Sequence, residues 1–214
     1  MSFLRIFLCL VVVVNHYYDL ILVDVWLDNK LSSQIAIDSF FIISGYLIYQ
    51  SIERNDLRAF FQKRVRRIVT PYIIVIVLMA TSAAIIAQQI DISLLKYFIA
   101  NVTFLNFLYP QVFDIFATNN HVEFNGSLWT LKIEVSFYIL ISLLFYLKPN
   151  IRSVETVWKL LIPATLLTII AEQVELQNVF VRQFPFQFYK FLLGMLLYSY
   201  FSKSAINLTT LRNR

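Results

Sequence analysis

Long apolar runs that are almost free of charge restrict most strongly how this chain can fold. Five of them stand out, at residues 3–14, 35–49, 68–87, 128–147 and 160–171. About 20 mostly apolar residues cross the hydrocarbon core of a bilayer, and a segment in lipid must satisfy its backbone hydrogen bonds internally. Only 14% of the residues are charged, against about 25% in soluble domains. The sequence therefore predicts an all-α fold, with residues 1–214 forming one polytopic transmembrane bundle of about six to seven helices.

The distribution of Lys and Arg predicts the orientation of these spans. Residues 53–67 hold six of the 18 basic residues, whereas residues 110–127 hold none. Cytoplasmic loops are enriched in Lys and Arg, so the first segment is expected inside and the second outside. Lys148 and Arg152 mark a second inner loop, and both chain termini are expected in the cytoplasm. The spans then fall at about residues 4–23, 35–52, 68–88, 128–147, 158–175 and 185–201.

The segment at residues 94–109 is left over by this alternation. It is short and carries Lys96, Asn101 and Asn106. Charge alternation favours a re-entrant or surface helix there, with a true span as the alternative.

Other sequence features exclude several kinds of site. The first apolar run lacks a small-residue cleavage site, which argues against a cleaved signal peptide. Cys9 is the only cysteine, so the chain can hold no internal disulfide and no cysteine-based metal site. The net charge of +5 is attributed to loops rather than to a nucleic-acid surface.

His16 is the clearest ionisable residue within a predicted span. Arg5 precedes it by eleven residues, and eleven steps of ~100° place the two on one face of a helix, ~16 Å apart along its axis. Imidazole can accept a proton near neutral pH, which suits a general base acting on a hydroxyl. The alternative is a histidine at the membrane interface, with Arg5 as a positive-inside anchor.

Two carboxylates also lie in apolar segments. Asp38 opens the second span. There it either caps the helix or supports His16 electrostatically across the hairpin that the first two spans would form. Glu134 lies two turns into the fourth span, where a bare carboxylate is costly and packing explains it poorly. Asn125 or Ser127 can cap this helix, and Trp129 fits an aromatic-belt anchor as well.

Arginine and glycine complete the candidate residues. Arg64 and Arg67 are i,i+3 neighbours on one helical face, which suits phosphate recognition, although a positive-inside loop would look the same. Gly45 and Gly194 are two of only three glycines and lie within spans. Small residues there allow close helix approach or open space for a ligand.

Together these residues resemble acyltransferase family 3, the integral-membrane acyltransferases of bacterial surface glycans. Arg5 and His16 match its Arg-x10-His pattern. Residues 37–48 match its V-D-x-F-F-x-x-S-G-[FY]-L-I stretch, and residues 125–134 match N-x-S-L-W-x-L-x-x-E. Residues 63–71 resemble its basic segment ending in R-[IL]-x-P, with one extra residue before the proline, and residues 191–195 are a weaker fifth match. The resemblance runs from residue 1 to about 201.

The resemblance implies an O-acyltransferase of the bacterial inner membrane with an acyl-CoA donor, expected to be acetyl-CoA, bound from the cytoplasm. The acceptor would be a hydroxyl of a cell-surface or lipid-linked glycan, with no permanently bound cofactor and no metal. His16 would be the catalytic histidine, aided by Arg5, Asp38 and Glu134. Two further sets follow from the motifs, a CoA-phosphate cluster and a substrate cavity: Arg64, Arg66 and Arg67, and Ser44, Gly45, Asn125, Ser127 and Trp129.

Members of this family usually have about ten helices, more than the six or seven expected here. The resemblance therefore implies further helices or a partner chain that supplies them. Two rival interpretations are a non-catalytic transporter or membrane subunit and an inactive family member. An acetyl-transfer assay separates the first rival from the enzyme, and a neighbouring reading frame that encodes the missing helices argues against the second.

Overall fold

The structure, a computed structural model, describes residues 2–21, 29–54, 56–116, 123–124, 126–147, 153–174 and 184–212. These residues form helices and no strand, as the sequence predicted. The long helices are α1 (Ser2–Ile21), α2 (Asn29–Arg54), α3 (Leu57–Ala87), α5 (Trp129–Leu147), α6 (Val154–Gln173) and α8 (Phe184–Arg212). The short ones are α4 (Ile92–Val102), η1 (Asn106–Leu108) and η2 (Gly126–Leu128).

Four helices in the described part of the chain are long and apolar enough to cross a membrane. They are Ser33–Arg54 within α2, Arg58–Ala87 within α3, and all of α5 and α6. The surfaces of α3, α5 and α6 are rich in exposed large apolar side chains, which suits contact with lipid. These four helices therefore agree with the predicted transmembrane bundle.

The basic segment at residues 53–67 is mostly helical, which corrects the expectation of a loop. Asp56 begins α3 as its N-cap, since its carboxylate accepts a hydrogen bond from the Ala59 amide at 2.7 Å. From there α3 continues without a break through Pro71 to Ala87. Asp is a favoured N-cap, so the sequence did carry a signal for this earlier start.

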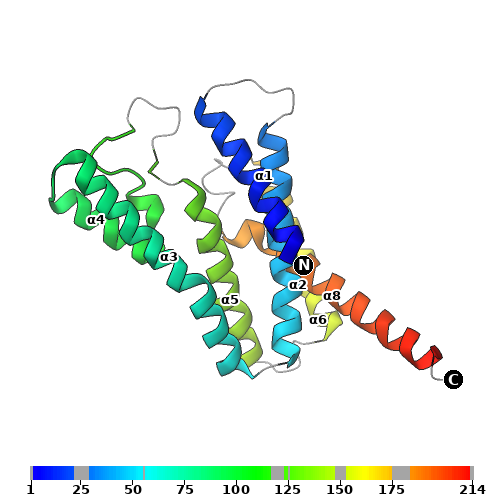
Figure 1. Cartoon of the computed structure of the whole chain (residues 1–214). Coiled ribbons are helices and arrows are strands. Elements are labelled where there is room, and N and C mark those ends of the chain that lie inside the picture. The colour runs from blue at the N-terminus through cyan, green and yellow to red at the C-terminus, as the bar shows by residue number, and fades with distance from the viewer. Residues whose placement is uncertain are drawn as a thin grey trace.

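The segment at residues 94–109 is divided between helix α4, which has 11 residues, and the short η1. At 1.5 Å per residue α4 is about 16 Å long, too short to cross a bilayer of about 30 Å on its own. It packs along the second half of α3, and the hydroxyl of Tyr72, at the middle of α3, donates to the Asn101 carbonyl at 2.6 Å (Figure 1). The structure thus favours the re-entrant or surface helix over a span.

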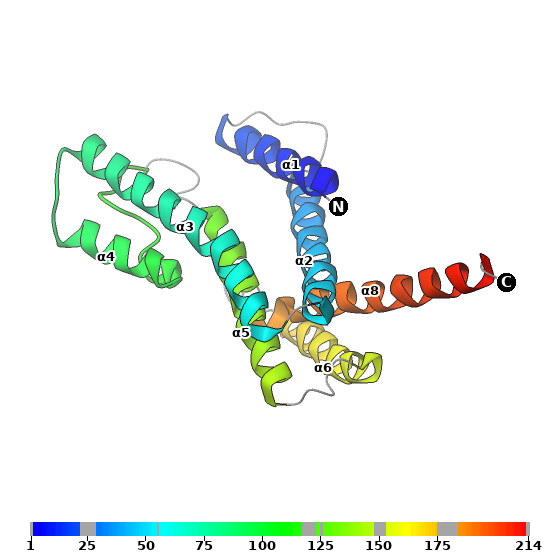
Figure 2. The same cartoon turned by 60° about the horizontal axis from the view of Figure 1, so that its bottom comes forward.

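Helix α2 is the centre of the arrangement, with α1 packed antiparallel on one side and α8 crossing on the other (Figure 1, Figure 2). A Cβ added at Gly45 would lie 2.0 Å from the Phe191 carbonyl oxygen, and one at Gly194 would lie 1.9 Å from the Ile42 carbonyl oxygen. No side chain fits in such contacts, so both glycines serve the close approach of α2 and α8.

Helix α5 joins this centre through an aromatic core. The ring of Phe191 on α8 packs on Phe137 of α5 at 4.2 Å and on Phe41 of α2 at 4.9 Å between centroids. All three are buried. This core fixes α5 beside α2, and that contact brings together the polar residues described next.

Candidate active site

Glu134 lies at the centre of a polar network that connects four helices. Ser44 on α2 donates to Glu134 Oε1 on α5 at 3.0 Å, and Arg5 Nη2 on α1 donates to Ser44 Oγ at 3.0 Å. The Tyr138 hydroxyl, one turn along α5, donates to the same carboxylate oxygen. Arg64 on α3 extends the network, since its guanidinium lies over the Tyr138 ring at 5.6 Å from the centroid. We call these five residues the Glu134 network.

Arg64 is the buried member of the predicted arginine cluster. Its side chain is 8% exposed, donates to the Leu47 carbonyl at 3.0 Å and also lies over the Phe60 ring at 5.5 Å. Arg66 and Arg67 are exposed. The three arginines therefore do not form one surface patch: Arg64 belongs to the interior and the other two to the surface of α3.

The network carries more positive than negative charge. Arg5 reaches Glu134 through Ser44, and Arg64 lies over the ring of Tyr138, whose hydroxyl also donates to Glu134. Two arginines of the network thus accompany one carboxylate. The Arg5 Nε is buried and has no hydrogen-bond partner among the described residues. Such a site lacks an acceptor, and an anionic ligand would supply one.

His16 lies apart from this network. Because α1 and α2 are antiparallel and Arg5 contacts Ser44, His16 is roughly level with residue 33 of α2, ~16 Å further along. Its side chain is exposed. The structure therefore does not bring His16 to Glu134; it places them at two depths along one side of α2.

Asp38 contacts α8 instead of His16. Its carboxylate Oδ1 accepts from Lys190 Nζ at 2.5 Å and from Gln34 Nε2 at 2.7 Å. Lys190 is buried and also donates to Gln187 at 2.7 Å. These contacts do not link Asp38 to His16. They make Asp38 and Lys190 an ion pair between α2 and α8.

The remaining predicted residues divide into two groups. Trp129 is partly buried and packs edge-on against Phe41, with ring centroids 6.2 Å apart, and Gly45 lies at the α2–α8 crossing. Asn125 and the side chain of Ser127 lie outside the described residues. The substrate-cavity assignment of these residues stays a prediction.

Two site residues, Tyr138 and Lys190, were missed by the sequence reasoning. Lys190 is a charged residue within the expected span at residues 185–201, which is itself a signal of function or pairing. Tyr138 is four residues after Glu134 and therefore on the same helical face. The sequence therefore could have singled out both residues, although it could not show that Lys190 pairs with Asp38.

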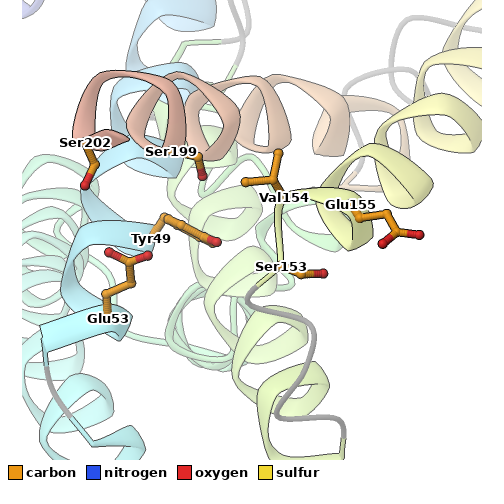
Figure 3. Close-up of a pocket in the computed structure, with 7 residues that line it drawn as sticks. All are labelled: Tyr49, Glu53, Ser153, Val154, Glu155, Ser199 and Ser202. Atoms are coloured by element: carbon orange, nitrogen blue, oxygen red, sulfur yellow. The ribbon is translucent and has the colours of Figure 1, made fainter. Parts of the chain in front are cut away.

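The described residues form two cavities of interest, of which only the second contains residues of the Glu134 network. The first, about 380 Å³, is formed by α2, the start of α6 and α8 and is lined by Tyr49, Glu53, Ser153, Val154, Glu155, Ser199 and Ser202 (Figure 3). Two carboxylates and no Lys or Arg line it, which disfavours a polyphosphate. The second, about 180 Å³, is an apolar groove between α3 and α5 with Arg64 and Tyr138 in its wall.

Comparison with known proteins agrees with the motifs. The family described as "Acyltransferase domain" matches residues 1–212. O-acetyltransferase OatA of Staphylococcus aureus (strain NCTC 8325 / PS 47) is 29% identical over 117 residues, which cover 51% of this chain and 19% of that protein. An O-acetyl transferase of Shigella phage Sf6 is 34% identical over 109 residues, covering 50% of this chain and 33% of that protein.

The aligned segments thus span a third or less of the length of these relatives. No solved structure matches the chain. The family match, by contrast, covers nearly the whole sequence and includes every residue of the Glu134 network. The chain belongs to the acyltransferase domain family that its four motifs indicated.

Proposed function

We propose that the protein is an inner-membrane O-acyltransferase that moves an acetyl group from cytoplasmic acetyl-CoA to a hydroxyl of a surface or lipid-linked glycan. The observation that carries this proposal is the excess of arginine in the Glu134 network, where Arg5 and Arg64 accompany one carboxylate and the buried Arg5 Nε has no hydrogen-bond partner among the described residues. A transporter for a neutral solute would not need two arginines beside one carboxylate in a membrane helix bundle. A donor with several phosphates would supply the missing negative charge. The two relatives named as O-acetyl transferases support the acetyl group.

The proposed path runs along α2. The donor's phosphates bind at the basic start of α3, and the donor then passes Arg5, Ser44 and Glu134 towards His16. From the level of Leu47, where Arg64 binds, to the level of His16 is about 14 residues of α2, or about 20 Å. The path therefore connects the cytoplasmic end with the outer end of the bundle in the orientation predicted from the sequence.

The proposed chemistry takes place at the His16 end. The glycan hydroxyl oxygen attacks the thioester carbonyl carbon while His16 accepts the hydroxyl proton. The new C–O ester bond forms, the C–S bond breaks, and the CoA thiolate leaves and takes the proton from His16. The exposed position of His16 suits a base that must reach a second substrate.

The donor site predicts a change in KM rather than in stability. We expect Arg67→Gln to raise the KM for acetyl-CoA about tenfold, because one exposed charge-assisted phosphate contact is lost, and added salt to weaken donor binding. Steady-state release of CoA thiol measures both effects. Arg58→Gln, at another exposed arginine of α3, is the matched control and should leave KM unchanged. Equal KM values for Arg67→Gln and the parent protein would reduce Arg67 to a topology signal.

A further inference from the structure

Helix α4 packs one face on α3 and leaves a second apolar face exposed. Tyr97 and Asn101 are buried on the side of α3. Ile92, Leu95 and Ile99 follow one another at steps of three and four residues on the outward face and are 50–64% exposed. Contiguous large apolar side chains of this kind mark a surface that meets a membrane or another protein.

The turn after α4 continues this apolar surface into η1. Phe104 has a φ of 61°, which is unusual for a residue with a side chain, and its ring stacks on Tyr72 with centroids 4.4 Å apart. The Leu105 amide donates to the Ala100 carbonyl at 2.7 Å and closes the turn. The large side chains that follow are 42–54% exposed: Leu105, Phe107, Leu108 and Tyr109. The turn is therefore held in a conformation that presents apolar side chains outward.

Two lysines lie over aromatic rings of this segment. Lys96 Nζ is 6.0 Å from the ring centroid of Tyr109, and Lys132 Nζ, in the first turn of α5, is 4.6 Å from the ring centroid of Phe107. Neither α4 nor η1 contains an acidic residue. Asp91, which precedes α4, uses its carboxylate to cap that helix by accepting hydrogen bonds from two backbone amides. The exposed apolar surface therefore carries positive charge.

The surface is continuous with the exposed side of a helix that can span a membrane. Helix α3 is long and apolar enough to cross a bilayer, and Ile85 and Ile86 in its last turn are exposed. Ile90, in the connection between α3 and α4, is 84% exposed. Figures 1 and 2 show α4 beside the second half of α3 and away from α6 and α8. Lipid around the end of α3 would therefore also meet α4 and η1.

A bilayer surface matches this combination of side chains better than a protein partner does. Amphipathic helices at a membrane place large apolar side chains among the acyl chains and keep Lys and aromatic residues near the headgroups. Lysines at that level attract anionic lipids. A protein partner would have to cover α4, η1 and the end of α3 at once, whereas lipid surrounds all three without a specific fit.

We propose that α4 and η1 lie in the bilayer leaflet at the C-terminal end of α3 and bind anionic phospholipid there. The exposed apolar side chains contact the acyl chains, and Lys96 and Lys132 bind lipid phosphates. The proposal adds a partner and a preference for its charge to the re-entrant or surface helix expected from the sequence. It does not depend on acyl transfer.

Fluorescence quenching in proteoliposomes tests the position of α4. In a Cys9→Ser protein, which lacks the only cysteine, Ile99→Cys is labelled with bimane. We expect a nitroxide on the acyl chain of phosphatidylcholine to quench this label at least about threefold more than a label at Glu155→Cys, and aqueous iodide to show the reverse order. Glu155, exposed in the first turn of α6, is the matched control.

Two results of this measurement would overturn the proposal. Quenching of the Ile99→Cys label by iodide and not by the nitroxide lipid would place this face of α4 in water. Quenching by neither would show that a protein covers it.

A second comparison tests the preference for anionic lipid at the same position. The Ile99→Cys label is quenched by trace nitroxide-labelled phosphatidylglycerol or phosphatidylcholine in otherwise identical phosphatidylcholine vesicles. We expect phosphatidylglycerol to quench about fivefold more effectively, because one lysine near a membrane surface favours an anionic lipid by about that factor. Lys96→Gln with Lys132→Gln should bring the ratio close to one. Lys159→Gln, at an exposed lysine of α6, should keep it.

Lys96→Gln alone covers the case in which the double variant does not fold, since the Lys96 side chain is exposed. It should lower the ratio at least about twofold. Equal quenching by the two lipids in the parent protein, or a ratio that neither variant changes, would overturn the assignment of an anionic lipid to this surface.

Discussion

His16→Gln is expected to reduce acyl transfer at least about 10²-fold while leaving insertion and folding unchanged. General-base catalysis is typically worth about 10²–10⁴-fold, and an amide cannot accept a proton at neutral pH. The side chain is exposed at the end of α1, so its replacement removes little packing. The measurement is the rate of acetyl ester formation on the glycan at saturating acetyl-CoA, per amount of inserted protein.

The chain offers a matched control for this substitution. His121 is its other histidine, and His121→Gln should keep the parent rate. A His16→Gln protein with a rate near that of the parent would defeat the proposed base. The search would then move to Glu134, whose carboxylate already accepts hydrogen bonds from Ser44 and Tyr138.

Asp38→Ala is expected to destabilise the fold by about 3 kcal/mol, because it leaves the buried Lys190 ammonium without its counter-ion. Removing one partner of a buried ion pair costs about 3–5 kcal/mol, and we take the low end since the Asp38 side chain is 33% exposed. Gln187 still accepts a hydrogen bond from Lys190, which reduces the loss of stability. Thermal or denaturant unfolding in detergent micelles measures the change.

The double variant separates a packing role of Asp38 from a catalytic one. Lys190→Met removes the unpaired charge, so Asp38→Ala with Lys190→Met should recover most of the lost stability. If Asp38 acts only through the α2–α8 ion pair, activity recovers together with stability. Recovered stability with activity still about 10²-fold down would show that Asp38 supports His16 after all.

The apolar runs predicted the helices because a charge-free segment of about 20 residues has one stable structure in lipid. The same runs predicted the first residue of α3 poorly. The first turns of α3 are basic and amphipathic, and the apolar pattern begins only at Ile68. The N-cap Asp56 was the better signal there. Apolar content locates what lies in the membrane, whereas capping residues locate where a helix begins.

Only part of the candidate site could be predicted from the sequence, for a related reason. Motif spacing selected Arg5, Ser44 and Glu134, and the structure joins them through hydrogen bonds. Pairing between helices that are distant in sequence was not readable: Asp38 contacts Lys190, 152 positions away, instead of His16. Helical periodicity fixes which residues share a face of one helix, but only packing decides which face meets which neighbour.

The most direct test of the account is the fate of a labelled acetyl group. Membranes that carry the protein are incubated with acetyl-CoA labelled in the acetyl carbon, and the label in the saccharide fraction is measured before and after mild alkali. We predict a labelled, alkali-sensitive ester whose formation requires acetyl-CoA and falls at least about 10²-fold in His16→Gln. A correctly inserted protein that forms no labelled ester, or forms it equally well with His16→Gln, would contradict the proposed acetyl transfer and the role of His16.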